Sequence, residues 1–141
     1  MDELDASGGT VYRGVADKET VLTEPGLIVY RFDAPLVFPN AAFFTERLEE
    51  LVANAGAGLK CIILDAEAIS DFDSTAAEAL ENLDADLERQ GVDLWIARAN
   101  TSLRQLLTTT GLMKRLGAEH VYPSVRAAVE AYHAQYGAAA Q

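Results

Sequence analysis

Two aspartates stand directly before a pair of hydroxyl residues in the stretch SDFDSTAAEAL, residues 70–80. Asp71 and Asp73 could bind a cation, while the hydroxyls of Ser74 and Thr75 could act as nucleophiles or accept a phosphate. The alanine-rich residues that follow predict a helix, so all four side chains would lie at a helix start. Side chains of these types also cap helices, and any chemistry has to be weighed against capping.

Capping explains part of this stretch. Thr75 with Glu78 fits the Ser/Thr-x-x-Glu capping box, and Asp73 or Ser74 would serve in a shifted register. One hydroxyl and one acid remain unassigned. A phosphate on Ser74 would be favoured by the positive end of the helix dipole and opposed by Asp71 and Asp73. We therefore expect a charge-sensitive contact surface here.

Catalytic arrangements are not found around these residues. Ser74 lacks the flanking glycines of a nucleophile elbow, and His120 and His133 lie far along the chain. Asp71 and Asp73 lack the spaced oxygen donors of a calcium loop. Neither a Gly-x-x-x-x-Gly-Lys loop nor a Gly-x-Gly-x-x-Gly turn is present. We expect no enzyme, no catalytic residues, no metal site and no required cofactor.

The elements that would position the polar stretch can be predicted. Continuous apolar runs at CIILDAE (61–67) and DLWIARA (93–99) indicate two central parallel strands. An amphipathic helix between them, ended by Gly91, makes a right-handed crossover unit. In such sheets ligands meet the loops at the carboxyl ends of the strands. The loops 65–75 and 99–103 gather eight polar residues: Asp65, Asp71, Asp73, Ser74, Thr75, Asn100, Thr101 and Ser102.

The first part of the chain predicts a leader, a hairpin and a helix. Residues 1–10 read as a loose leader, and TVYRGV (10–15) and GLIVYRFDA (26–34) as two strands, the second after a Pro25-Gly26 turn. Residues 40–55 have helical apolar spacing, with Asn40 as the expected N-cap and Gly56 as the stop.

The last part predicts shorter elements. They are a helix at 102–109, a basic turn at 112–117, a strand at 120–124, a helix from Ser124 and a frayed tail at 136–141. The alternation of strands and helices predicts an α/β fold with a mixed sheet of about four to five strands and about four to five helices. One domain over residues 11–135 is expected.

Composition and charge narrow the function. The chain has 141 residues, 50% of them hydrophobic, and the single Cys61 lies in an apolar run, as a buried thiol would. Neither a membrane span nor a signal peptide is evident, which predicts a soluble, cytosolic domain. The net charge of −11 argues against nucleic acid.

Charge is unevenly distributed along the chain. Residues 1–97 hold 6 Lys/Arg against 20 Asp/Glu, whereas residues 98–141 hold 5 against 2. Such asymmetry is useful for docking, and ordinary solvated faces would produce it as well.

A buried strand ending in Asp65, a loop closing on DSTA and an amphipathic helix together resemble the STAS domain. That domain is shared by bacterial anti-sigma factor antagonists and by the cytoplasmic C-terminal part of SulP-type sulfate and anion transporters. The stretch VYRFDAPLVFPNAAFF is similar to the transporter branch, with its Arg-containing strand, Ala-Pro-Leu and Phe-x-Asn-Ala. The resemblance covers roughly residues 11–135.

The resemblance implies a location and partners. The chain would be a non-catalytic regulatory and docking domain at the cytoplasmic face of the plasma membrane. Its partners would be the membrane domain of the same transporter, a second copy in a homodimer, or a cytosolic protein. The other branch implies a free-standing anti-sigma factor antagonist, switched by phosphorylation.

The resemblance also implies site residues. The family's phosphorylatable serine falls on Ser74, preceded by Asp73, with Ala76 where antagonists often have glycine. A regulatory nucleotide, GTP or ATP with Mg²⁺, would bind the loops at 38–40, 71–77 and 98–104. Besides the eight polar residues named above, these loops contribute Phe38, Pro39 and Asn40, together with Arg98 and Arg104 as counter-charges.

Overall fold

A five-stranded mixed sheet forms the centre of the protein in this computed structural model, which describes residues 19–37, 40–69 and 72–137. The strands are β1 (Glu19–Glu24), β2 (Leu27–Phe32), β3 (Cys61–Asp65), β4 (Asp93–Ala97) and β5 (Val121–Tyr122), in the spatial order β1-β2-β3-β4-β5. β1 runs antiparallel to β2, and the other neighbours are parallel. The predicted α/β class and mixed sheet are confirmed.

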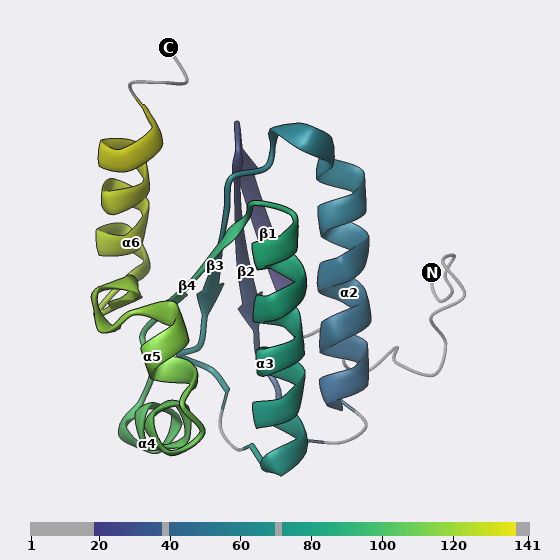
Figure 1. Cartoon of the computed structure of the whole chain (residues 1–141), viewed down its shortest axis with the longest axis vertical. Helices are drawn as coiled ribbons and strands as arrows, with labels where there is room; N and C mark the ends of the chain where they lie inside the picture. Colours follow the sequence, from purple (N-terminus) through teal and green to yellow (C-terminus); the bar gives the residue numbers. More distant parts are fainter. Residues whose placement is uncertain (1–18, 38–39, 70–71, 138–141) are drawn as a thin grey trace.

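Helices cover both faces of this sheet. They are α2 (Asn40–Ala55), α3 (Ser74–Arg89), α4 (Thr101–Thr109), α5 (Leu112–Leu116) and α6 (Val125–Tyr132), with short 3₁₀ turns at Gly56–Gly58 and Ala118–His120 and a π-helical turn at His133–Gly137. Figure 1 shows α2 and α3 side by side in front of the sheet and α6 on its other side. Parallel strands buried between helices explain why β3 and β4 are apolar at almost every position.

Strand alternation divides the core in two. On the α2–α3 side, Ile62, Leu64 and Ile96 pack against the apolar stripes of both helices and against leucines from α4 and α5. On the α6 side, Ile63 and Trp95 pack against Ala128, Tyr132 and the other residues of that face. Cys61 belongs to this second core and is fully buried, as predicted, and its burial raises the pKa of the thiol.

The hairpin differs from the prediction. Its first strand is ETVLTE (19–24), which pairs with β2 across the Pro25-Gly26 turn, and TVYRGV lies outside the described residues. ETVLTE carries little apolar alternation because β1 is an edge strand of the sheet, with four of its six residues exposed. The turn residues were the correct signal, and the strand partner was placed too far upstream.

Further differences concern helix ends and the tail. The predicted basic turn at 112–117 is the short helix α5, because Leu112 and Leu116 are one turn apart and both are buried. Tyr136, in the predicted frayed tail, packs against Tyr132, and its hydroxyl donates a hydrogen bond to Asp93. Among the described residues no helix is long and apolar enough to cross a membrane.

Candidate functional site

The carboxyl ends of β2, β3 and β4 carry a group of five charged residues, which we call the strand-end ion cluster: Arg31, Asp33, Asp65, Glu67 and Arg98. Register explains the assembly, since Arg31 pairs with Asp65 and Asp65 pairs with Ala97, the residue before Arg98. Alternation along β3 places Asp65 on the face that packs against α6.

Asp65 is the centre of this cluster. It is 4% exposed, and it is the single polar or charged side chain in the buried set of the described residues. Arg98 binds it with two nitrogens, Nε to Oδ1 at 3.2 Å and an η-nitrogen to Oδ2 at 2.8 Å. Arg31 reaches Oδ2 at 3.2 Å, and the Glu67 backbone N–H donates to Oδ1 at 3.2 Å. The buried charge is thus paired and hydrogen-bonded, as burial requires.

These contacts decide the protonation state of Asp65. Burial by itself raises the pKa of a carboxyl group, but the hydrogen bonds from Arg98, Glu67 and Arg31 outweigh burial and hold the pKa of Asp65 below its ordinary value. In turn, the bond to Asp65 raises the pKa of Arg98. The two arginines and the aspartate are therefore all charged at neutral pH.

Helix α3 begins at Ser74, and Asp73 is its N-cap. Asp73 has an extended backbone, and its Oδ1 accepts the Ala76 N–H at 3.2 Å. The Thr75–Glu78 box is therefore wrong, and the shifted register with Asp73 is correct, because aspartate is at least as good an N-cap as threonine. Ser74 is exposed at the first position of the helix.

Helix α4, which follows β4, begins in the same way. Asn100 is the N-cap, with Oδ1 accepting the Leu103 N–H at 2.8 Å, and Thr101 and Ser102 are exposed in the first turn. Arg104 turns back, donating from Nε to the Ala99 carbonyl at 3.3 Å. Asn100 therefore has a capping role that the sequence analysis did not assign to it.

Asn40, at the start of α2, has a different local role from the N-cap that was predicted for it. The predicted N-cap Asn40 is already the first residue of α2, and its amide donates to the Pro35 carbonyl at 3.0 Å. The Ala41 N–H reaches the Val37 carbonyl, so the helical hydrogen bonds begin earlier than expected. An isolated parallel bridge between Leu36 and Phe72 lays this loop alongside the approach to α3.

The predicted residues therefore form more than one group. Asp65 and Arg98 bind each other, Asp73 and Asn100 cap helices, and Ser74, Thr101, Ser102 and Arg104 are exposed; Thr75 is half-buried. Phe38, Pro39 and Asp71 lie outside the described residues. Arg31 and Glu67 were missed. The sequence showed that Arg31 lies in a strand, but not the parallel register that sets it opposite Asp65.

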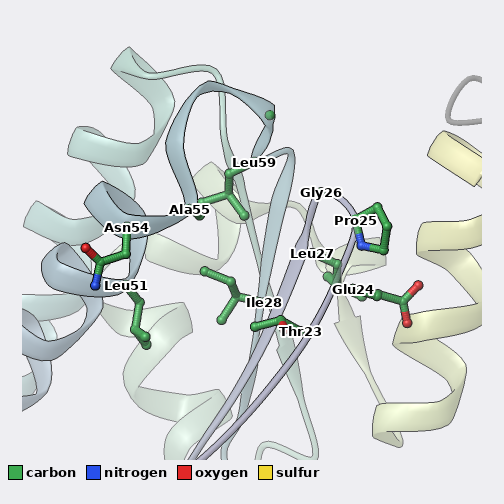
Figure 2. A pocket seen from close by; sticks show the side chains of 11 residues that line it. Thr23, Glu24, Pro25, Gly26, Leu27, Ile28, Leu51, Asn54, Ala55 and Leu59 are labelled. Atoms are coloured by element: carbon green, nitrogen blue, oxygen red, sulfur yellow. The ribbon is translucent and has the colours of Figure 1, made fainter.

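A cavity lies elsewhere, at the turn between β1 and β2. It has a volume of about 580 Å³, and none of the predicted site residues that the structure describes lines it. Figure 2 shows Leu51, Ile28 and Leu59 around it, while Glu24 points away toward α6. Its described lining residues include no Lys or Arg, so they offer a phosphate no counter-charge. Within the described part of the chain, no group of three or more His, Cys, Asp or Glu side chains could hold a metal ion.

Comparison with known proteins agrees with this architecture. The sequence model of the STAS domain matches residues 20–128. A probable sulfate transporter of Mycobacterium tuberculosis is 36% identical over 108 residues, which are 77% of this chain and 19% of that protein. A probable sulfate transporter of Arabidopsis thaliana is 29% identical over 87% of this chain and 20% of its own length. The chain thus spans about a fifth of the curated relatives that it matches.

Solved structures show the same fold. The STAS domain of a SulP transporter from Vibrio cholerae has a TM-score of 0.71 and 24% identity, covering 93% of this chain and 99% of that one. A putative anti-sigma factor antagonist from Thermotoga maritima has a TM-score of 0.69 and 17% identity, covering 79% and 92%. At these identities the structural likeness shows the fold alone. Because the family's sequence model matches residues 20–128, the chain belongs to the STAS domain family.

Proposed function

We propose that this chain is the regulatory and docking domain of a SulP-like anion transporter, held at the cytoplasmic face of the membrane. The observation that carries the proposal is the extent of the match, 77% of this chain against 19% of a probable sulfate transporter. A segment of that size within a transporter is one accessory domain. Sulfate is the expected anion because the matched relatives are described as sulfate transporters.

Docking would use the exposed start of α3. Ser74 is exposed there, while Asp73 beside it is already engaged as the N-cap. The first turn of α4 adds two exposed hydroxyl residues, Thr101 and Ser102. These exposed polar groups at the starts of α3 and α4 suit a transient contact rather than a permanent one, because water can hydrate them when the contact opens. The membrane domain of the same transporter is the proposed partner, and a second copy or a cytosolic protein are the other occupants.

The coding sequence around this chain is the first test. Membrane-spanning segments encoded upstream in the same reading frame support the transporter assignment, and a start codon at Met1 with no such segments contradicts it. In the intact transporter, Ser74→Glu adds charge at the proposed contact, whereas Gln90→Glu adds the same charge just beyond the other end of α3. We expect sulfate uptake to fall several-fold with the first substitution alone. Equal uptake by both variants would remove the start of α3 from the docking surface.

A regulatory nucleotide, GTP or ATP with Mg²⁺, belongs to the same proposal. The starts of α3 and α4 offer backbone N–H groups to a phosphate, and Arg104 is exposed nearby in α4. Arg98 is a weaker counter-charge, because Asp65 and Glu67 already hold it. Titration of ¹⁵N-labelled domain with Mg-GTP, and separately with Mg-ATP, would give saturable shifts at Ser74 and Asn100. Unchanged spectra at millimolar nucleotide would reject binding.

A second function has one observation in its favour. The Asp-Ser-Thr-Ala motif places Ser74 in an exposed position at a helix start, where a kinase could reach it and where a phosphate is electrostatically favoured. In this alternative the chain is a free-standing anti-sigma factor antagonist released by phosphorylation of Ser74. Phosphate on Ser74 in protein isolated from cells, together with a captured anti-sigma kinase, would favour it over the transporter assignment.

A further inference from the structure

Arg98 has a left-handed backbone, with φ of +61°, and every other positive φ in the described residues belongs to a glycine. Residues with a Cβ avoid this region because the Cβ approaches the following carbonyl oxygen. Asparagine, aspartate and glycine are the usual exceptions, and arginine is not among them. Such a conformation persists only where the surroundings hold it.

The contacts around Arg98 are of two kinds. Its backbone N–H donates to the Tyr122 carbonyl at 2.9 Å, which fixes the position of the Arg98 backbone nitrogen relative to β5. Its guanidinium is held by Asp65 through two nitrogens and by Glu67 at 3.0 Å. The backbone bond does not determine the direction in which the chain leaves residue 98. The side-chain contacts can, because they tie the end of a long side chain to a buried, charged partner.

The direction of exit matters for the residues that follow. Ala99 and Asn100 connect Arg98 to α4, and Asn100 is the N-cap of that helix. A residue in the extended region at position 98 would continue the path of β4 rather than turn toward α4. The left-handed residue therefore places the cap of α4, and with it the exposed Thr101 and Ser102.

We infer that Asp65 is a positioning residue: its carboxylate holds Arg98 in the left-handed conformation and thereby sets the path from β4 to α4. Asp65 thus makes the shape of this edge depend on a single buried charge. The consequence for docking rests on the proposed function, because the 99–102 segment is part of the proposed contact surface. The geometric role of Asp65 does not.

The test uses the isolated chain and backbone NMR. Asp65→Asn keeps the shape of the side chain but removes its charge and replaces one acceptor by a donor. We expect φ of residue 98, measured from chemical shifts and the three-bond HN–Hα coupling, to leave the positive region, and the amide signals of residues 99–103 to move. In the double variant Asp65→Asn, Arg98→Gly, glycine adopts the left-handed conformation freely, and those amide signals should return to their wild-type positions.

The restoration separates positioning from a purely structural ion pair. A structural pair predicts that the double variant, which lacks the pair entirely, remains shifted. Arg31→Gln is the matched control, because it removes the other arginine of Asp65 and should leave residues 99–103 unmoved. A positive φ at residue 98 in Asp65→Asn, or no restoration by Arg98→Gly, would overturn the inference.

A second pair of variants covers the case in which Asp65→Asn fails to fold. Arg98→Ala keeps the Cβ and loses the guanidinium, whereas Arg98→Gly loses both. We expect the unfolding equilibrium constant of Arg98→Ala to exceed that of Arg98→Gly by roughly threefold or more, with only the alanine variant leaving the left-handed region. Equal stability and equal 99–103 signals would overturn the inference. The experiment uses no partner, nucleotide or transport assay, so its failure and a failure of the proposed function are distinguishable.

Discussion

Asp65 accepts four hydrogen bonds and has almost no contact with water. Asp73, in the neighbouring loop, is exposed and accepts the N–H of Ala76 at the start of α3. The first carboxylate connects three strands, and the second completes one helix. A substitution at Asp65 should therefore change how stability depends on pH, whereas a substitution at Asp73 should remove a helix cap.

Stability should depend on the charge of Asp65 in acid. Because its folded-state pKa lies below the unfolded value of about 3.9, its contribution is fully present above that value and is lost as pH falls through the folded pKa. Urea unfolding of the wild type from pH 6 downward should show this loss. Asp65→Asn should be less stable at pH 6 and should lack that part of the decline, and parallel pH profiles for the two proteins would contradict the assignment.

Capping at α3 can be tested with neighbouring substitutions. Asp73→Ala should lower the free energy of unfolding by about 1 kcal/mol, because the Ala76 N–H loses its side-chain acceptor. Ser74→Ala should change it by no more than roughly 0.5 kcal/mol, since Ser74 is exposed and is not the cap. Fluorescence of the single Trp95 during urea unfolding measures both. A larger effect at Ser74 than at Asp73 would mean that the helix is capped in another register.

At the scale of elements, the β1–β2 hairpin is held to both layers of helices. Glu19 in β1 accepts hydrogen bonds from Tyr30 and from Arg47 of α2. At the other end of the hairpin, the Tyr132 hydroxyl of α6 donates to the Pro25 carbonyl at 2.7 Å. The turn itself is therefore a packing site as well as a connection.

Gly26 is needed at this turn for two reasons. Its φ is +80°, and a Cβ there would collide with the Tyr132 hydroxyl oxygen and approach Lys60 Cγ to 3.1 Å. Gly26→Ala should therefore destabilise the protein by more than about 1 kcal/mol. Gly111→Ala, with φ of +82° and open space around it, measures the backbone cost alone.

Gly58→Ala completes the comparison, because Gly58 has neither a positive φ nor a neighbour within 4 Å of an added Cβ. The expected order of destabilisation in thermal or urea unfolding is Gly26, then Gly111, then Gly58. Equal losses at Gly26 and Gly111 would show that contact with α6 adds nothing at the turn.

For the whole molecule, charge and ion pairing act in opposite directions. The net charge of −11 produces self-repulsion in the compact state, while pairs such as Arg115 with Asp84 and Glu88 join α5 to α3. Exposed pairs contribute little and are screened together with the repulsion. We expect the melting temperature to rise by a few degrees between roughly 10 and 150 mM NaCl. A falling melting temperature would mean that the ion pairs dominate.

The pattern of apolar residues along the chain located most of the fold. The helices α2 and α3 follow from helical side-chain spacing, and the buried strands β3 and β4 follow from continuous apolar runs; both patterns depend only on local geometry. The first strand of the hairpin was misplaced, because a strand at the edge of a sheet needs little apolar alternation. The five-residue helix α5 was read as a turn, because one helical turn has no period to detect.

What the sequence determined by itself is the family, the α/β class and a helix start somewhere between Asp73 and Thr75, because motif, period and capping depend on residues close together in the chain; the structure selected Asp73 as the cap. Only the tertiary structure decided which charges meet. Arg31, Asp65 and Arg98 are more than thirty residues apart from one another, and strand register brings them together. Register is set by the packing of whole strands between helices. The pairing of Arg98 with Asp65, both predicted as site residues, therefore became visible only in the assembled sheet.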